Sequence, residues 1–212
     1  MRPPWRLLAW NVAGTRPRRA RLIGVPELEV IEQTDEQLAA EAAREGSDGP
    51  AFVALVERFR QRVWRICFRL LGNEQDASDA AQEVFLRLFT HRTKFEGRSK
   101  YGTWVHAIAV RTCLTFRRGR GRRRSHEDTV SHERWEMEQP TQEASRPGLA
   151  IDLMRMLETL DEEDRAMLIL KYAESYDYEE LSEIFGLSVS ACKMRLLRAR
   201  EKLQQRFPEH TL

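Results

Sequence analysis

The sequence has little glycine and proline, and it shows no strand pattern. Its 212 residues include 11 glycines and 8 prolines. No stretch of useful length alternates apolar and polar residues, which is the pattern of a half-buried strand. Apolar residues recur instead at steps of three and four over long segments, which is the spacing of one helix face. We therefore predict an all-α fold.

Cysteine and histidine are also scarce and scattered. Cys67, Cys113 and Cys192 lie far apart, and each falls on or near an apolar helical face. Neither they nor the 5 histidines have the spacing of metal ligands. We expect three buried free thiols, no metal and no cofactor. No carboxylate cluster or nucleophile–base pair indicates catalysis, so we do not expect an enzyme.

The sequence contains no apolar run of about 18 residues, the length that a membrane-spanning helix needs. The short apolar run Leu7–Ala13 lacks the apolar core and the cleavage site of an export signal. We therefore expect a cytoplasmic protein without membrane insertion. Its 35 Lys and Arg nearly balance 33 Asp and Glu, with a net charge of +2. Affinity for a polyanion must then come from local patches.

The chain divides into two helical domains. Residues 1–33 have no apolar period, so we expect them to be disordered or weakly structured. The first domain covers 34–118, a basic and then polar flexible linker covers 119–147, and the second domain covers 148–207. Helices are predicted at 35–45, 51–71, 76–91 and 102–118. The second domain opens with an amphipathic segment at 148–160. Asp161 caps the next helix, whose core side holds Met167, Leu168 and Leu170, with Tyr172 a further candidate.

Residues 178–203 have the pattern of a helix-turn-helix. Asp177 and Glu180 can form a capping box at its start. Gly186 stands where a left-handed residue ends a helix, and Ser188 can cap the next one. The apolar residues of the second helix form one stripe that we expect to be buried: Val189, Cys192, Leu196, Ala199 and Leu203.

The other side of that second helix is basic. Outward positions near its start, where a recognition helix meets base edges in a major groove, are Ser190, Lys193, Met194, Leu197 and Arg198. The alternative is an ordinary helix pair with a solvated basic face. The tight turn and the nearly acid-free face from Ser190 to Arg200 favour DNA binding.

The helix predicted at 76–91 carries acidic and amide groups opposite its apolar side: Asp76, Asp79, Gln82 and Glu83. One interpretation is that the helix dipole favours acid near the N-terminus. The other is a docking face for a basic partner. Composition alone favours the dipole interpretation.

A loop at 94–101 and the helix after it gather aromatic and basic residues: Lys94, Arg98, Lys100, Tyr101, Trp104 and Arg111. Such a cluster suits single-stranded nucleic acid, because bases stack on rings while cations meet phosphates. Trp104 fits the core equally well by its helical spacing. Residues 117–124 then hold six arginines in eight residues, a footprint for a polyanion that does not read sequence.

Two motif sets together resemble the extracytoplasmic-function (ECF) sigma factors of bacterial RNA polymerase. Region 2 is matched by Asp79-Ala-Ala-Gln82-Glu83-Val-Phe85, Phe95-x-Gly97 and Thr103-Trp104. Region 4 is matched by Leu160-Asp161, Tyr178-Glu-Glu-Leu181, Gly186-Leu-Ser188 and Lys193-x-Arg195-Leu196-x-Arg198-Ala199-Arg200. The sets occur in the family's order, and the resemblance covers roughly residues 35–207.

The resemblance implies a role for each face. Docking on the clamp helices of the largest polymerase subunit would use Asp76, Asp79, Gln82 and Glu83. The resemblance therefore favours a docking face over the dipole interpretation of these residues. Bases of the opened minus-ten strand would be held by Lys94, Arg98, Ser99, Lys100, Tyr101, Trp104 and Arg111. The minus-thirty-five duplex would be read by Ser190, Lys193, Met194, Arg195, Leu197, Arg198 and Arg200. The implied partners are core RNA polymerase, promoter DNA and, as a candidate, an anti-sigma factor.

Three departures from the family pattern concern promoter choice and local packing. Ala80-Ala81 stand where a larger pair is usual, Arg98 stands where an acidic residue precedes the loop serine, and Met194 replaces a small polar residue. The alternative function is a stand-alone helix-turn-helix regulator. It would bind a palindromic duplex without polymerase, but the sequence offers little dimer seam.

Overall fold

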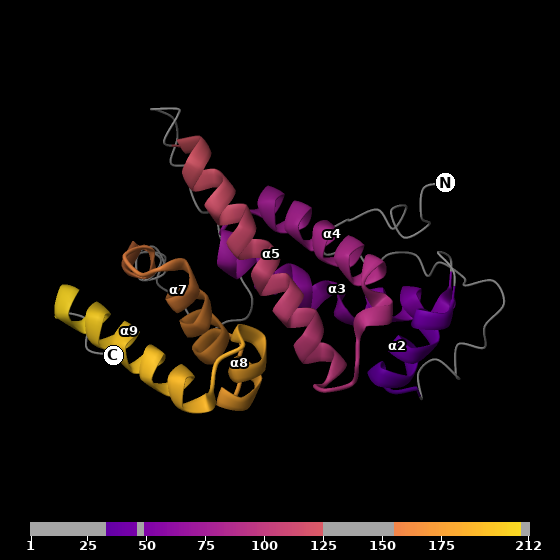
Figure 1. The fold of residues 1–212 in the computed structure, drawn as a ribbon. Coiled ribbons are helices and arrows are strands. Elements are labelled where there is room, and N and C mark those ends of the chain that lie inside the picture. Colours follow the sequence, from indigo (N-terminus) through magenta and orange to yellow (C-terminus); the bar gives the residue numbers. More distant parts are fainter. Residues whose placement is uncertain (1–32, 46–48, 125–154, 209–212) are drawn as a thin grey trace, which may run out of the picture.

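The computed structural model describes residues 33–45, 49–124 and 155–208, and the elements in these ranges are helical, as predicted (Figure 1). The α-helices are α2 (Asp35–Arg44), α3 (Pro50–Leu71), α4 (Glu74–Thr90), α5 (Tyr101–Arg124), α7 (Glu162–Leu168), α8 (Tyr178–Phe185) and α9 (Val189–Arg206). A 3-10 turn, η2 (Arg92–Lys94), and a π turn, η3 (Ile169–Ala173), complete them. The predicted N-terminal extension, most of the predicted linker and the predicted segment up to residue 154 lie outside the described residues.

The first helical unit is α2 to α5, and local chemistry explains most of its bounds. Thr34 caps α2 in a capping box with Gln37. Gly72 ends α3 in the left-handed region at φ 83°, and Asn73 caps α4 by accepting a hydrogen bond from the Asp76 amide. Helices α3, α4 and α5 pack on one another around a shared apolar core.

Helix α5 continues beyond its predicted end. The sequence predicted that it stops at Arg118 and that a linker begins at 119, but the helix runs to Arg124. Arginine is a good helix former, and the two glycines in this run cost only about 1 kcal/mol each. The end of α5 therefore projects past the neighbouring helices (Figure 1).

The second unit, α7 to α9, contains the predicted helix-turn-helix. The Asp177–Glu180 capping box, the left-handed Gly186 at φ 67° and the Ser188 cap are all present. The predicted stripe of α9 is buried at Cys192, Leu196, Ala199 and Leu203, whereas Val189 is only partly buried.

The prediction that Tyr172 belongs to the core is wrong. Its side chain is 57% exposed, and Tyr176, at 1%, is the buried tyrosine. The cause is the π turn, in which the Glu174 amide donates to the carbonyl of Ile169, five residues earlier. The extra residue in this turn rotates Tyr172 outward relative to a regular helix.

The three cysteines are buried free thiols, as predicted. Cys67 of α3 hydrogen-bonds Cys113 of α5, and this contact together with burial raises the pKa of the Cys67 thiol. Both thiols therefore act as small core groups. Within the described residues, none of the helices has the length and apolar character needed to cross a membrane.

Candidate nucleic-acid and protein interface

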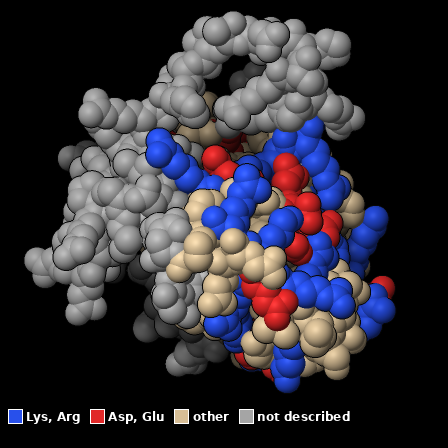
Figure 2. Space-filling model, turned by 90° about the vertical axis from the view of Figure 1, so that its left-hand side faces the viewer, with Lys and Arg blue, Asp and Glu red and all other residues tan. Residues whose placement is uncertain are grey.

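Helix α9 presents its predicted outward residues to solvent. Lys193 and Arg198 are exposed, as are Ser190 and Arg200. Met194 and Leu197 are 49% and 45% exposed, which is unusual for side chains of this size. Figure 2, which faces the end of the molecule that carries α7 and α9, shows Lys and Arg spread over this surface on either side of acidic side chains. This face can therefore meet a duplex with both cations and apolar groups.

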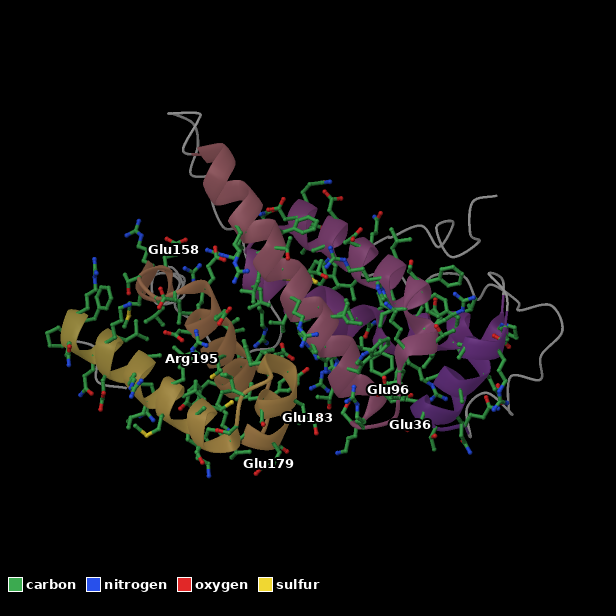
Figure 3. The ribbon with its side chains drawn as sticks, in the orientation of Figure 1. Glu36, Glu96, Glu158, Glu179, Glu183 and Arg195 are labelled. Atoms are coloured by element: carbon green, nitrogen blue, oxygen red, sulfur yellow. The ribbon has the colours of Figure 1, made fainter. Side chains whose placement is uncertain are left out.

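Arg195 is held differently from its neighbours on α9. It forms an ion pair with Glu163 at 3.0 Å and a second, charge-assisted hydrogen bond with Asp164, both in the first turn of α7. Figure 3 shows the side chain between α9 and α7. Arg195 therefore braces the recognition helix, and this contact argues against the direct DNA role predicted for it.

The polar side of α4 is partly engaged in contacts of its own. The Asn73 side chain donates to the Asp76 carboxylate at 2.7 Å, and Glu83 pairs with Arg87 at 2.7 Å along the helix. Asp79 and Gln82 are the exposed members of the predicted set. The most accessible part of this face is therefore the single turn from Asp79 to Gln82.

Tyr101 does not fit its predicted role as a base-stacking residue. It is 2% exposed, and its ring packs against Phe59, Phe95 and Trp104 at centroid distances of 5.7, 5.1 and 5.6 Å. Its backbone N–H donates to the Glu36 carboxylate at 3.1 Å, a bond that lowers the pKa of Glu36. Tyr101 is the core support beneath Trp104.

Trp104 is partly buried and lies at the edge of the core rather than inside it. Arg111 is exposed two helical turns further along α5, with Ile108 partly exposed between them. Helical spacing puts these three residues on one side of α5. Lys94, Arg98 and Lys100 are exposed in the preceding segment, and Arg98 pairs with Glu96 at 3.0 Å. Ser99, also predicted here, is partly exposed.

A contact that joins the two units has no signal in the sequence. The Tyr176 hydroxyl hydrogen-bonds His106 Nδ1 of α5 at 2.5 Å across 70 residues of chain, and both side chains are buried. A lone histidine on an apolar face and a tyrosine in a turn carry no local signal of pairing. Only the packing of α8 on α5 brings them together.

The second unit is a helix-turn-helix with an exposed basic recognition face, and the first unit has a basic and aromatic edge. Together they define a DNA-binding protein with two contact units. Family models identify the units. Sigma-70 region 2 matches residues 55–123, and Sigma-70 region 4 matches residues 150–203.

Curated relatives narrow the family. The chain is 31% identical to the ECF RNA polymerase sigma factor SigE of Mycolicibacterium smegmatis, over 76% of this chain and 63% of that protein. It is 28% identical to SigW of Bacillus subtilis, over 76% and 90%, and 29% identical to the sigma-E factor of Escherichia coli K12, over 82% and 95%. The chain thus spans just under two thirds of SigE and nearly all of the other two.

Two solved structures have a fold similar to that of this chain. The sigma factor RpoE, in complex with the anti-sigma factor NepR from Bartonella quintana, matches with a TM-score of 0.58 and 25% identity, over 73% of this chain and 94% of RpoE. CnrH, in complex with the cytosolic domain of CnrY, matches with a TM-score of 0.59 and 22% identity, over 84% and 100%. This chain belongs to the ECF subfamily of RNA polymerase sigma factors.

Proposed function

We propose that this chain binds core RNA polymerase in the cytoplasm and directs it to promoters through three separate faces. It has no reaction of its own and lends recognition to the polymerase. The observation that carries the proposal is the presence, on one chain, of an exposed acidic turn in the region 2 unit and an exposed basic recognition helix in the region 4 unit. The domain bounds that we propose are 34–124 and 148–207, with the linker between them.

The acidic turn is the proposed contact with core polymerase. Asp79 and Gln82 are exposed, while Asp76 and Glu83 flank them in contacts within the helix. An exposed carboxylate on a rigid helix suits a basic partner helix, since charge complementarity speeds and orients association. The partner is the clamp helices of the largest subunit.

The free side of α5 is the proposed contact with the opened minus-ten strand. Trp104 rests on the buried Tyr101 ring, which holds it at the surface as a fixed stacking platform. Arg111 lies along the same side of the helix, within reach of a strand that stacks there. Lys94, Arg98, Ser99 and Lys100 would meet its phosphates, because cations and rings together hold single strands with little sequence preference.

The recognition helix is the proposed contact with the minus-thirty-five duplex. Lys193 and Arg198 supply cations for phosphates and base edges, and Arg200 lies further along the same exposed face. Met194 and Leu197 supply apolar surface of the kind that meets thymine methyl groups. Ser190 lies at the helix start. The sigma factor RpoE, which is 25% identical to this chain, was solved in complex with an anti-sigma factor, so we propose an anti-sigma partner for this chain as well.

Run-off transcription on a promoter library tests the proposal. Purified core polymerase with this chain should initiate at a subset of promoters that share two elements at fixed spacing, and core alone should not. Absence of core binding at micromolar concentration would contradict the proposal. Tight binding of a palindromic duplex by the chain alone would support the stand-alone regulator instead.

A further inference from the structure

Helix α2 holds both ends of the α4–α5 connection, residues 91–100. Near the start of this connection, the Arg92 guanidinium donates to the Ala42 carbonyl at 3.1 Å and to the Glu45 carbonyl at 3.4 Å, both at the C-terminal end of α2. After its last residue, the Tyr101 N–H donates to the carboxylate of Glu36, in the first turn of α2, at 3.1 Å (Figure 3). Both ends of the connection are therefore tied to one helix.

Each tie satisfies a helix end. The first N–H groups of α5 have no carbonyl partner within the helix, and a carboxylate such as that of Glu36 also suits the positive end of the helix dipole. The last carbonyls of α2 lack partners in the same way, and a guanidinium can reach two of them at once. Arg92 also donates to the Phe89 carbonyl at 2.9 Å and lies over the Phe89 ring, 4.4 Å from its centroid. Loss of either tie therefore leaves backbone groups without their partners.

The middle of the connection is fixed by aromatic rings. The Phe95 ring packs against Tyr101 and Trp104 at centroid distances of 5.1 and 5.5 Å. Gly97 follows with φ 70° and open space around it, so the chain turns away from the core at this point. The three anchors leave only residues 96–100 free. This free stretch carries the loop residues proposed to contact the minus-ten strand, Arg98, Ser99 and Lys100.

We propose that α2 braces the α4–α5 connection for base recognition, with Glu36 and Arg92 as the positioning residues. Neither belongs to the surface proposed for the strand, and both act by fixing where residues 96–100 lie beside the Trp104 ring. A loop with fixed ends loses less conformational freedom when it closes on a base, so it discriminates that base more strongly. The inference rests on the proposed function for what the loop contacts, whereas the ties are a property of the free chain.

Hydrogen exchange of the free full-length chain, followed by NMR, measures each tie. Glu36→Ala should speed exchange of the Tyr101 amide about fivefold, which is the typical effect of removing a helix cap. Glu36→Gln should restore the wild-type rate, since an amide oxygen can accept the same hydrogen bond. Arg92→Ala should speed exchange of the Lys94 amide, which donates to the His91 carbonyl at 2.8 Å within η2, by about fivefold.

Asp35→Ala is the matched control for Glu36→Ala. Asp35 precedes Glu36 on α2, but its carboxylate pairs with Arg58 of α3 at 2.8 Å. Its removal loosens α2 without removing either tie, so both exchange rates should stay at the wild-type value. Arg92→Lys keeps the charge without the guanidinium fork, and it replaces Arg92→Ala if that variant does not fold. Far-UV circular dichroism checks that each variant keeps its helix content.

The role in base recognition is measured on holoenzyme assembled from core polymerase and each full-length variant. The probe is a single-stranded oligonucleotide with the minus-ten element of a promoter selected by run-off transcription, and a matched set carries one abasic position each. The ratio of intact to abasic affinity should reach about tenfold at one or more positions for wild type, because a stacked base contributes about that much. Glu36→Ala and Arg92→Ala should lower the largest ratio about fivefold, and Glu36→Gln should restore it.

A brace for base recognition and a general support of the fold predict different results. For the brace, affinity for the abasic strands and for the minus-thirty-five duplex should stay at the wild-type value in every variant. If Asp35→Ala lowers the ratio as much as Glu36→Ala, the effect is a general loosening of α2 and the proposal is overturned. Unchanged exchange in the Glu36→Ala and Arg92→Ala variants would overturn the ties, and faster exchange with an unchanged ratio would overturn the positioning role. If wild-type holoenzyme discriminates no position, the proposed minus-ten contact fails, while exchange still decides whether α2 ties the connection.

Discussion

Acid should open the contact between the two units, because His106 cannot take up a proton while the contact is closed. Burial, with a smaller contribution from the charge of Arg62, lowers the pKa of His106 from 6.5 to about 3. The groups that face it are the Arg62 guanidinium of α3 and the Tyr176 hydroxyl, with the Phe59 ring 6.1 Å from it. None of these supplies a negative charge at neutral pH.

The sign and size of the pH effect follow from the linkage between protonation of His106 and opening of the contact. Above pH 6.5 the imidazole is neutral in both forms, so it gives no pH dependence. Below pH 6.5 the open form binds a proton that the closed form refuses, and each pH unit favours opening by about 1.4 kcal/mol. The closed-to-open ratio should then fall about tenfold at pH 5.5 and about a hundredfold at pH 4.5. The full effect, reached near pH 3, is about 5 kcal/mol.

Two dyes are attached to cysteines that replace exposed Gln61 of α3 and Gln205 of α9, since the native thiols are buried. Energy transfer between them, followed from pH 7.5 to pH 5, measures this shift. His106→Gln removes the titrating group, and its profile should be flat. His91→Gln keeps His106 and should give the wild-type profile, since His91 caps the end of α4 and its ring hydrogen-bonds within that helix. If His106→Gln and wild type share one pH profile, the reasoning is refuted.

Further substitutions test the recognition helix, the acidic turn of α4 and the segment before α8. Lys193→Ala or Arg198→Ala should weaken binding of the minus-thirty-five duplex by about 1–3 kcal/mol in a titration of the duplex and leave core affinity unchanged. Asp79→Arg should lower core affinity about tenfold or more in a pull-down or titration and leave duplex binding unchanged. Ser175→Gly should favour the closed form by about 1 kcal/mol, read by energy transfer, because glycine removes the strain at φ 59°.

The helix-turn-helix could be predicted because its signals are local. The Asp177–Glu180 box closes over three residues, and the Ser188 cap closes over the same separation. Gly186 adopts positive φ, which other residues resist. None of these contacts depends on the rest of the chain, so sequence and structure agree at this element.

The Tyr176–His106 contact and the braced Arg195 could not be predicted, because the partners in each are distant in sequence. Arg195 meets Asp164 across 31 residues, and nothing near it on α9 distinguishes it from the exposed Arg198. Tyr172 and Tyr176 exchange expected places because one π turn shifts the helical register, and periodicity assumes a regular helix. Tyr101 has the sequence position of a surface ring at a loop end, but its ring packs against Phe59 and Phe95.

Helix α5 has three sides, and their order explains what the contact between the two units leaves exposed. One side, with Val105 and Cys113, lies in the core of the region 2 unit, and a second, with His106, meets the region 4 unit. The third, with Trp104 and Arg111, keeps its exposure in the closed form. The platform that we propose for the opened minus-ten strand is therefore accessible whether or not the units separate. The contact between the units therefore bears on the proposed two-point binding of the promoter, while the exposed side of α5 is the same in either arrangement.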